Sequence, residues 1–234
     1  MTERWQPYWD WLRLVCPNDW IISFNYDLLV ETLLKASTKP LGKARKKNFE
    51  QEPIVVLAPT DEAPSFPGRA KMLKLHGSVD WKRTSVGYVQ TENGRFALTC
   101  ADEEIGIASP GSNKLLESND GLKPLWTLAD AALRQCDAIV LLGYRFPPSD
   151  AHARRTIVSA LAAHSDKKHH RNAHVVLMNN SPEAGRTAGI LEYAMKRSGR
   201  GERSSGYAHG YQIFKQPLSV EDFLTVVERG QLFA

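Results

Sequence analysis

Short apolar runs alternate along the chain with longer stretches in which apolar residues recur every three or four positions. The short runs predict buried strands, and the longer stretches predict amphipathic helices. The predicted strands cover residues 20–24, 54–57, 71–75, 137–142 and 173–178, with an edge strand at 211–214. The predicted helices cover residues 3–16, 28–36, 122–135, 151–163, 182–196 and 220–228.

The run at 138–142, Ala-Ile-Val-Leu-Leu, is apolar at every position. Such a run is typical of a strand that is covered on both faces, as in a parallel sheet. Helices and strands alternate through most of the chain, and this order favours a doubly wound α/β fold. We therefore expect a Rossmann-like, mostly parallel sheet with helices on both faces.

The least regular part of the chain is the stretch 79–121. Within it, residues 81–83 and 87–90 predict a hairpin, and residues 96–99 predict a third strand. We interpret 79–121 as a small irregular β insert or sub-module rather than an independent domain. The 234 residues then fit a single domain, 1–234, that carries this insert.

The composition is that of an ordinary soluble globular protein, with 42% hydrophobic and 24% charged residues. The net charge of +4 fits an anionic ligand without requiring one. The short basic runs at 43–47 and 167–171 favour solvated surface over nucleic-acid contact, so we expect no nucleic-acid partner. The apolar runs are all far shorter than the ~18 residues of a membrane span, and we expect no membrane partner.

The three cysteines are widely spaced and form no Cys-x-x-Cys pair. A disulfide framework and a four-thiolate zinc site are therefore not expected. The first residues lack the apolar stretch of a signal peptide. A reducing, cytoplasmic location is the simplest expectation.

Polar residues follow four of the predicted strands, in the segments 23–27, 75–78, 142–150 and 177–180. The carboxyl ends of strands are where open α/β sheets bind ligands. After the first strand, the amide of Asn25 and the carboxylate of Asp27 can bind a sugar hydroxyl, a carboxamide or a water molecule. The alternative is that Asp27 only caps the helix that follows.

His76, followed by Gly77, comes after another predicted strand. An imidazole can accept a proton from a ribose hydroxyl near neutral pH, and glycine lets a ligand or backbone approach closely. The alternative is a packed histidine that is bonded to the backbone.

Two further strand ends carry groups suited to a nucleotide. Gly143 ends the most apolar strand, and Arg145 can bind phosphate through its planar guanidinium, or else form a surface ion pair. Asn179 and Asn180 can bind ribose hydroxyls or adenine, or else form a turn before the next helix.

Taken together, the four segments resemble the sirtuin superfamily, and more closely its bacterial branch associated with NAD hydrolysis and phage defence. Residues 23–27 resemble the Thr-Gln-Asn-Ile-Asp motif, and His76-Gly77 resembles the catalytic His-Gly. Gly143-Tyr144-Arg145 with its Phe-Pro-Pro-Ser-Asp tail resembles the Gly-Tyr-Ser-Phe-Pro-Pro-x-Asp segment of that branch. The agreement in order and spacing extends over about residues 20–195.

The resemblance implies a Rossmann-like domain that binds NAD. It implies that Asn25 positions the nicotinamide ribose or a water, that Asp27 holds the carboxamide, and that His76 accepts a hydrogen bond or proton from a ribose hydroxyl. The remaining residues that it assigns to NAD binding are Gly77, Gly143, Tyr144, Arg145 and Asn179. The expected activity is NAD glycohydrolysis, which yields nicotinamide and ADP-ribose. The alternative is an inactive module that senses NAD or ADP-ribose or assembles with a protein partner or a second copy.

The sequence departs from the family pattern at three places. The zinc-binding cysteines of the deacylase sirtuins are missing, because 79–121 holds only Cys100, so neither zinc nor deacylation is expected. Arg145 replaces a serine or similar small residue. No Gly-Ala-Gly-x-Ser segment precedes Trp20, which predicts an N-terminally incomplete domain with reduced affinity for the pyrophosphate of NAD.

Overall fold

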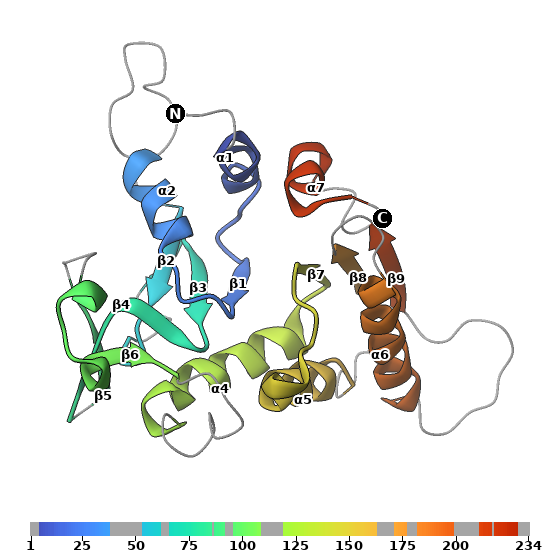
Figure 1. Cartoon of the computed structure of the whole chain (residues 1–234). Coiled ribbons are helices and arrows are strands. Elements are labelled where there is room, and N and C mark those ends of the chain that lie inside the picture. Colours follow the sequence, from blue (N-terminus) through green and yellow to red (C-terminus); the bar gives the residue numbers. More distant parts are fainter. Residues whose placement is uncertain are drawn as a thin grey trace, which may run out of the picture. The chain divides into compact units, whose positions relative to one another are not determined.

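The computed structural model describes residues 5–37, 53–61, 66–85, 87–91, 96–108, 119–162, 171–176, 182–198, 211–216 and 218–228 (Figure 1). The chain divides into two compact units. One is Val15–Ala129, and the other combines Met1–Leu14 with Asp130–Ala234. Each unit is built around its own parallel sheet of three strands, so the predicted Rossmann-like α/β class is confirmed.

The parallel sheet of the Val15–Ala129 unit has the order β1-β3-β2. Its strands are β1 (Trp20–Ser23), β2 (Ile54–Leu57) and β3 (Ala70–Lys74). In the register, the last residue of β1, Ser23, lies opposite the last residue of β3, Lys74. The carboxyl ends of these two strands therefore meet at one edge of the sheet. Helix α2 (Leu29–Ser37) follows β1.

A small antiparallel sheet with the order β5-β4-β6 follows β3 in the same unit. It consists of β4 (Gly77–Thr84), β5 (Gly87–Gln90) and β6 (Ile105–Ile107). The predicted hairpin is confirmed, since Arg83 of β4 pairs with Tyr88 of β5.

The predicted third strand at 96–99 is wrong. Residues Phe96–Leu98 form a 3-10 turn, and the third strand is β6, after a second short turn at Asp102–Glu104. Leu98 is 81% exposed, so it is not buried as a core residue of the sheet. Gly106 lets β6 pack closely on β4, because a Cβ there would lie 2.7 Å from the Cβ of Trp81.

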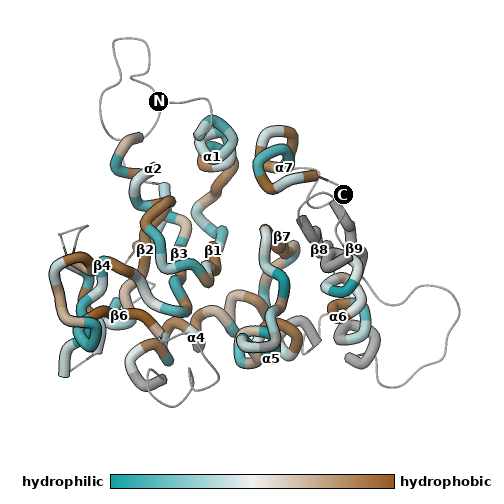
Figure 2. Tube along the Cα trace, in the orientation of Figure 1, coloured by the Kyte–Doolittle hydropathy of each residue, from teal (hydrophilic) through white to brown (hydrophobic). Residues whose placement is uncertain are grey.

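The core of this unit lies between its two sheets and helix α4 (Asn119–Gln135). Trp81 of β4 is completely buried. It packs in one cluster with residues of β2, β3 and α4, namely Leu57, Leu73, Leu122 and Leu125. Strand β2 is hydrophobic along its whole length (Figure 2).

The parallel sheet of the second unit has the order β7-β8-β9. It consists of β7 (Ala138–Leu142), β8 (Arg171–Val176) and β9 (Tyr211–Gln216). Strand β7 begins one residue later than predicted and ends where predicted. Strand β8 begins two residues earlier than predicted, and β9 is the predicted edge strand. In β7, Leu141 is buried and the other four residues are half-buried.

The remaining helices of this unit pack in two pairs. Helices α5 (Ala151–Ala162) and α6 (Pro182–Ser198) contact each other, and so do α1 (Gln6–Leu12) and α7 (Val220–Val226). Helix α1 is shorter than the predicted 3–16, with Trp5 as its N-cap and Arg13 as its C-cap. Among the described residues, no helix is both long and apolar enough to cross a bilayer.

Candidate functional site

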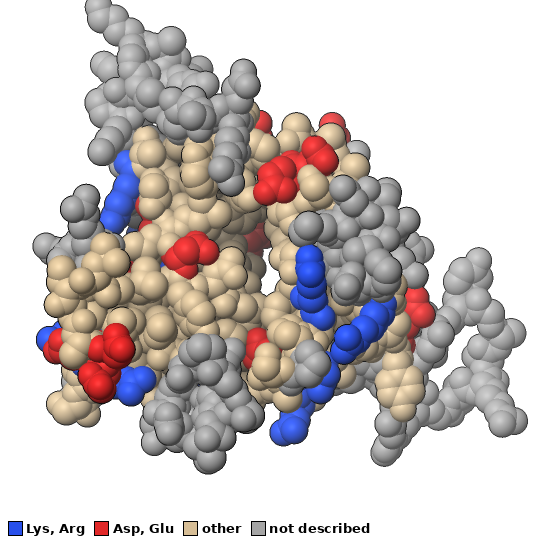
Figure 3. Space-filling model, viewed as in Figure 1, with Lys and Arg blue, Asp and Glu red and all other residues tan. Residues whose placement is uncertain are grey.

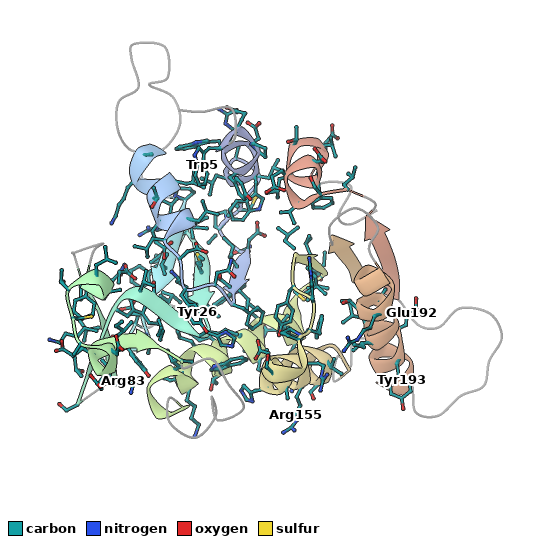
Figure 4. The ribbon with its side chains drawn as sticks, in the orientation of Figure 1. Trp5, Tyr26, Arg83, Arg155, Glu192 and Tyr193 are labelled. Atoms are coloured by element: carbon teal, nitrogen blue, oxygen red, sulfur yellow. The ribbon has the colours of Figure 1, made fainter. Side chains whose placement is uncertain are left out.

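The residues after β1 and those after β3 lie side by side at the carboxyl edge of the β1-β3-β2 sheet. The Leu75 N–H donates to the Ser23 carbonyl at 3.0 Å, and the Val79 N–H donates to the Tyr26 carbonyl at 3.1 Å. Figure 4 labels Tyr26 in this loop. Two segments that are about fifty positions apart are thus joined by backbone hydrogen bonds. The structure therefore brings Asn25 and Asp27 next to His76-Gly77.

The imidazole of His76 is surrounded by aromatic rings. Its centroid lies 5.4 Å from that of Phe24 and 6.1 Å from those of Tyr26 and Trp126. His76 is only 6% exposed, and its carbonyl accepts from the Ala108 N–H at 2.8 Å. His76 is therefore packed at the strand end rather than standing in an open crevice.

Asn25 and Asp27 are both exposed. One carboxylate oxygen of Asp27 accepts from the N–H of Leu29, the first residue of α2, at 3.0 Å. The predicted capping role is therefore present, and it uses one of the two oxygens. The N–H of Asn25 donates to the hydroxyl of Ser23 at 3.1 Å, which fixes the start of the loop.

Lys74, the last residue of β3, was not among the predicted site residues, and it is completely buried. Its ammonium donates to the Glu31 carboxylate at 2.9 Å, to the Ser78 hydroxyl at 2.7 Å and to the carbonyl of Asp27. A signal was present in the run Met72-Leu73-Lys74-Leu75, because a cation within an apolar strand needs a buried partner.

The contacts of Lys74 continue into the small antiparallel sheet. The hydroxyl of Ser78 donates to one oxygen of Asp80, and the side-chain amide of Gln90 donates to the other at 3.0 Å. Asp80 is 4% exposed and Ser78 is completely buried. A chain of buried hydrogen bonds thus links α2, β3 and the β4-β5 hairpin.

Gly77 has a structural reason for being glycine. Its φ is +84°, and a Cβ at this position would lie 2.0 Å from the carbonyl oxygen of Gly106. The close approach that the sequence predicted is therefore made by the backbone of β6.

The segment Gly143-Tyr144-Arg145 lies at the carboxyl end of β7, in the second unit. Gly143 has a φ of +68°, which suits glycine, and Arg145 is exposed. The Tyr144 hydroxyl donates to the carboxylate of Asp150 at 3.0 Å, and its ring lies 4.9 Å from that of the buried Phe146. Basic side chains also appear on the visible face over α5 and α6, where Arg155 is exposed (Figures 3 and 4).

Burial raises the pKa of Tyr144 well above its ordinary value, and the charge of Asp150 together with the hydrogen bond to it acts in the same direction. Because the folded state holds this proton more tightly than the unfolded state does, the resulting stabilisation is complete below the ordinary tyrosine pKa of about 10 and decreases as the pH rises beyond it.

We expect Tyr144→Phe to lower the free energy of unfolding at pH 7 by about 1–3 kcal/mol, because Asp150 then loses a donor while it stays buried. Urea denaturation measures the difference from the unchanged protein, which should shrink above about pH 10. The control is Tyr193→Phe on α6, where the side chain is 63% exposed. Equal losses in the two variants would contradict the stabilising role of the Tyr144–Asp150 contact.

The predicted site residues thus fall into two groups. Asn25, Asp27, His76 and Gly77 lie together in the Val15–Ala129 unit, whereas the 143–145 segment belongs to the other unit. Asn179 lies outside the described residues. Within the described ranges, no group of three or more His, Cys, Asp or Glu side chains is arranged to hold a metal ion.

Comparison with known proteins identifies the family. A search of the curated proteins finds no match. The model of a protein family described as the SIR2-like domain matches residues 19–197, from just before β1 to the last turn of α6. This span includes both groups of predicted site residues and nearly equals the range over which the sirtuin resemblance was predicted. The chain therefore belongs to the SIR2-like domain family, whose members generally use NAD.

Proposed function

We propose that the chain is an NAD glycohydrolase that releases nicotinamide and ADP-ribose. One observation carries this proposal: in a member of an NAD-using family, the loop with Asn25 and Asp27 is hydrogen-bonded to the segment with His76 at the ends of two adjacent parallel strands. Strand ends at this edge are the usual ligand-binding position of such sheets.

In the proposed reaction, the oxygen of a water molecule bonds to C1′ of the nicotinamide ribose as the bond from C1′ to the nicotinamide nitrogen breaks. The electron pair of the broken bond neutralises the pyridinium ring, and the water releases one proton to the solvent. His76 accepts a hydrogen bond from a ribose hydroxyl and so increases the electron density that stabilises the oxocarbenium-like transition state. Asn25 orients the water, and the Asp27 oxygen that does not cap α2 holds the carboxamide.

The surroundings of His76 support this chemistry. The imidazole is 6% exposed and is packed among the rings of Phe24, Tyr26 and Trp126. A site with little water strengthens electrostatic interactions with the developing charge. The sequence resemblance also assigns Gly143, Tyr144, Arg145 and Asn179 to NAD binding, and the exposed guanidinium of Arg145 is suited to a phosphate. The role in bacterial phage defence rests on the sequence resemblance of residues 143–150.

The second candidate function is a non-catalytic module that senses NAD or ADP-ribose. One observation favours it: a carboxylate oxygen of Asp27 is used to cap helix α2.

We expect the purified chain to convert NAD into equal amounts of nicotinamide and ADP-ribose, and Asn25→Ala to slow this conversion by about 10-fold or more, because the water loses its orienting group. Chromatography of the products measures the rate. The control is Gln6→Ala, in the other unit, which should leave the rate unchanged. A rise in the melting temperature with NAD but without turnover would favour the sensor. The absence of both turnover and a rise in melting temperature would overturn both functions.

A further inference from the structure

Lys74 uses all its hydrogen-bonding capacity inside the protein. An ammonium group has three protons to donate. In this structure, three acceptors receive them: the Glu31 carboxylate, the Ser78 hydroxyl and the Asp27 carbonyl. The carbonyl of Tyr26 lies slightly farther away, at 3.4 Å.

These acceptors come from the elements on either side of the candidate site. Asp27 ends the loop that carries Asn25, and Glu31 stands in the first turn of α2. Ser78 directly follows the His76-Gly77 pair. Lys74 thus connects the loop after β1 with the segment that holds the imidazole.

Stability alone is a weak reason for this arrangement. Replacing a buried ion pair with apolar side chains of similar size is often neutral or stabilising, because the charges lose their hydration. The second carboxylate oxygen of Glu31 is buried and has no hydrogen-bond partner among the described residues, so the pair is not fully satisfied there. The contacts of Lys74 indicate a different benefit, which is that they fix the geometry of the loop after β1.

We propose that Lys74 is a positioning residue, which holds the Asn25–Asp27 loop in register with His76. The proposal rests on the proposed NAD cleavage for its catalytic consequence, although the effect on the loop is independent of it. Lys74 itself is completely buried and acts through the backbone of the loop rather than on the substrate.

The test is the double variant Lys74→Met/Glu31→Met, which removes both charges at similar volume. We expect its melting temperature to stay within a few degrees of that of the unchanged protein, since both members of the ion pair are removed together and Asp80 keeps its hydrogen bonds from Ser78 and Gln90. We expect kcat for nicotinamide release to fall by about 10²-fold with KM changed by less than about 3-fold, because a loop shift of about 1 Å misplaces the groups at the reacting bond.

A second readout does not depend on NAD. The N–H groups of Leu29 and Val79 donate to the Asp27 carboxylate and the Tyr26 carbonyl, so their hydrogen exchange reports the order of the loop. We expect both to exchange at least about 10-fold faster in the double variant. If the unchanged protein releases no nicotinamide, the proposed function fails, and this measurement still decides the role of Lys74.

The matched control is Lys82→Met/Glu104→Met. This pair is joined at 3.0 Å in the same unit, but its side chains are 45% and 43% exposed. It should leave kcat and both exchange rates unchanged. If the double methionine variant does not fold, Lys74→Gln/Glu31→Gln replaces it. The glutamine at position 74 is shorter than lysine and loses the contact with the Asp27 carbonyl, so the same measurements apply. A folded variant with unchanged exchange of Leu29 and Val79 overturns the proposal.

Discussion

Replacing His76 with alanine is expected to reduce nicotinamide release by about 10²–10⁴-fold, the usual contribution of a group that takes part in proton transfer or accepts a hydrogen bond in the transition state. The reason is that the ribose hydroxyl loses its acceptor at the stage where positive charge develops on the sugar. Chromatographic measurement of the initial rate at saturating NAD gives this factor directly.

Alanine also removes a ring from the aromatic cluster, so a second variant is needed. His76→Phe keeps a ring among Phe24, Tyr26 and Trp126 but has no ring nitrogen. The melting temperature of His76→Phe should be closer to that of the unchanged protein than the melting temperature of His76→Ala is. The two variants should release nicotinamide at equally low rates. Turnover restored by phenylalanine would show that the imidazole serves packing only, and it would remove His76 from the mechanism.

The same variants test the proposed defence role in cells. Bacteria that express the unchanged chain are expected to form fewer phage plaques than bacteria that express His76→Phe, because NAD is consumed only in the first case. Equal plaque numbers, with equal amounts of both proteins, would exclude defence by NAD cleavage.

Local signals predicted much of the fold. The position of β7 was predicted to within one residue because an unbroken apolar run, Ala138–Leu142, ends at a glycine, and that run needs no information from elsewhere in the chain. The meeting of Asn25 with His76 was also predictable, because the carboxyl ends of parallel strands lie at one edge of a sheet. The third strand of the small sheet was not predictable in this way. Its position depends on the contact between Gly106 and Trp81, which are distant in sequence.

The surroundings of the site residues could not be predicted from local patterns. Glu31 is the ionic partner of Lys74, but it lies 43 positions away, and a lysine in a strand does not indicate which carboxylate will meet it. The burial of His76 depends on Trp126, which comes from α4. The sequence therefore supplied the groups at the strand ends, whereas their depth and their partners result from packing between distant elements.

Gly77→Ala is expected to lower the free energy of unfolding by about 2–5 kcal/mol. Backbone strain at the positive φ of +84° accounts for about 1–2 kcal/mol of this loss. Forcing a methyl group against the carbonyl of Gly106, which would lie 2.0 Å from it, accounts for about 1–3 kcal/mol more. Urea denaturation followed by tryptophan fluorescence measures the loss, since Trp81 is buried in the core of the same unit.

Gly68→Ala is the matched control for this substitution. Gly68 also has a positive φ, +75°, but a Cβ there would have no atom within 4 Å, so only the strain of about 1–2 kcal/mol is expected. Equal losses at the two positions would show that β4 and β6 do not approach closely at Gly77. The pair also separates fold from ligand: if Gly77 serves the fold, saturating NAD should raise the melting temperatures of Gly77→Ala and the unchanged protein by the same amount. If NAD raises the melting temperature of the unchanged protein but not that of Gly77→Ala, this glycine takes part in the binding of NAD, as the sequence resemblance implies.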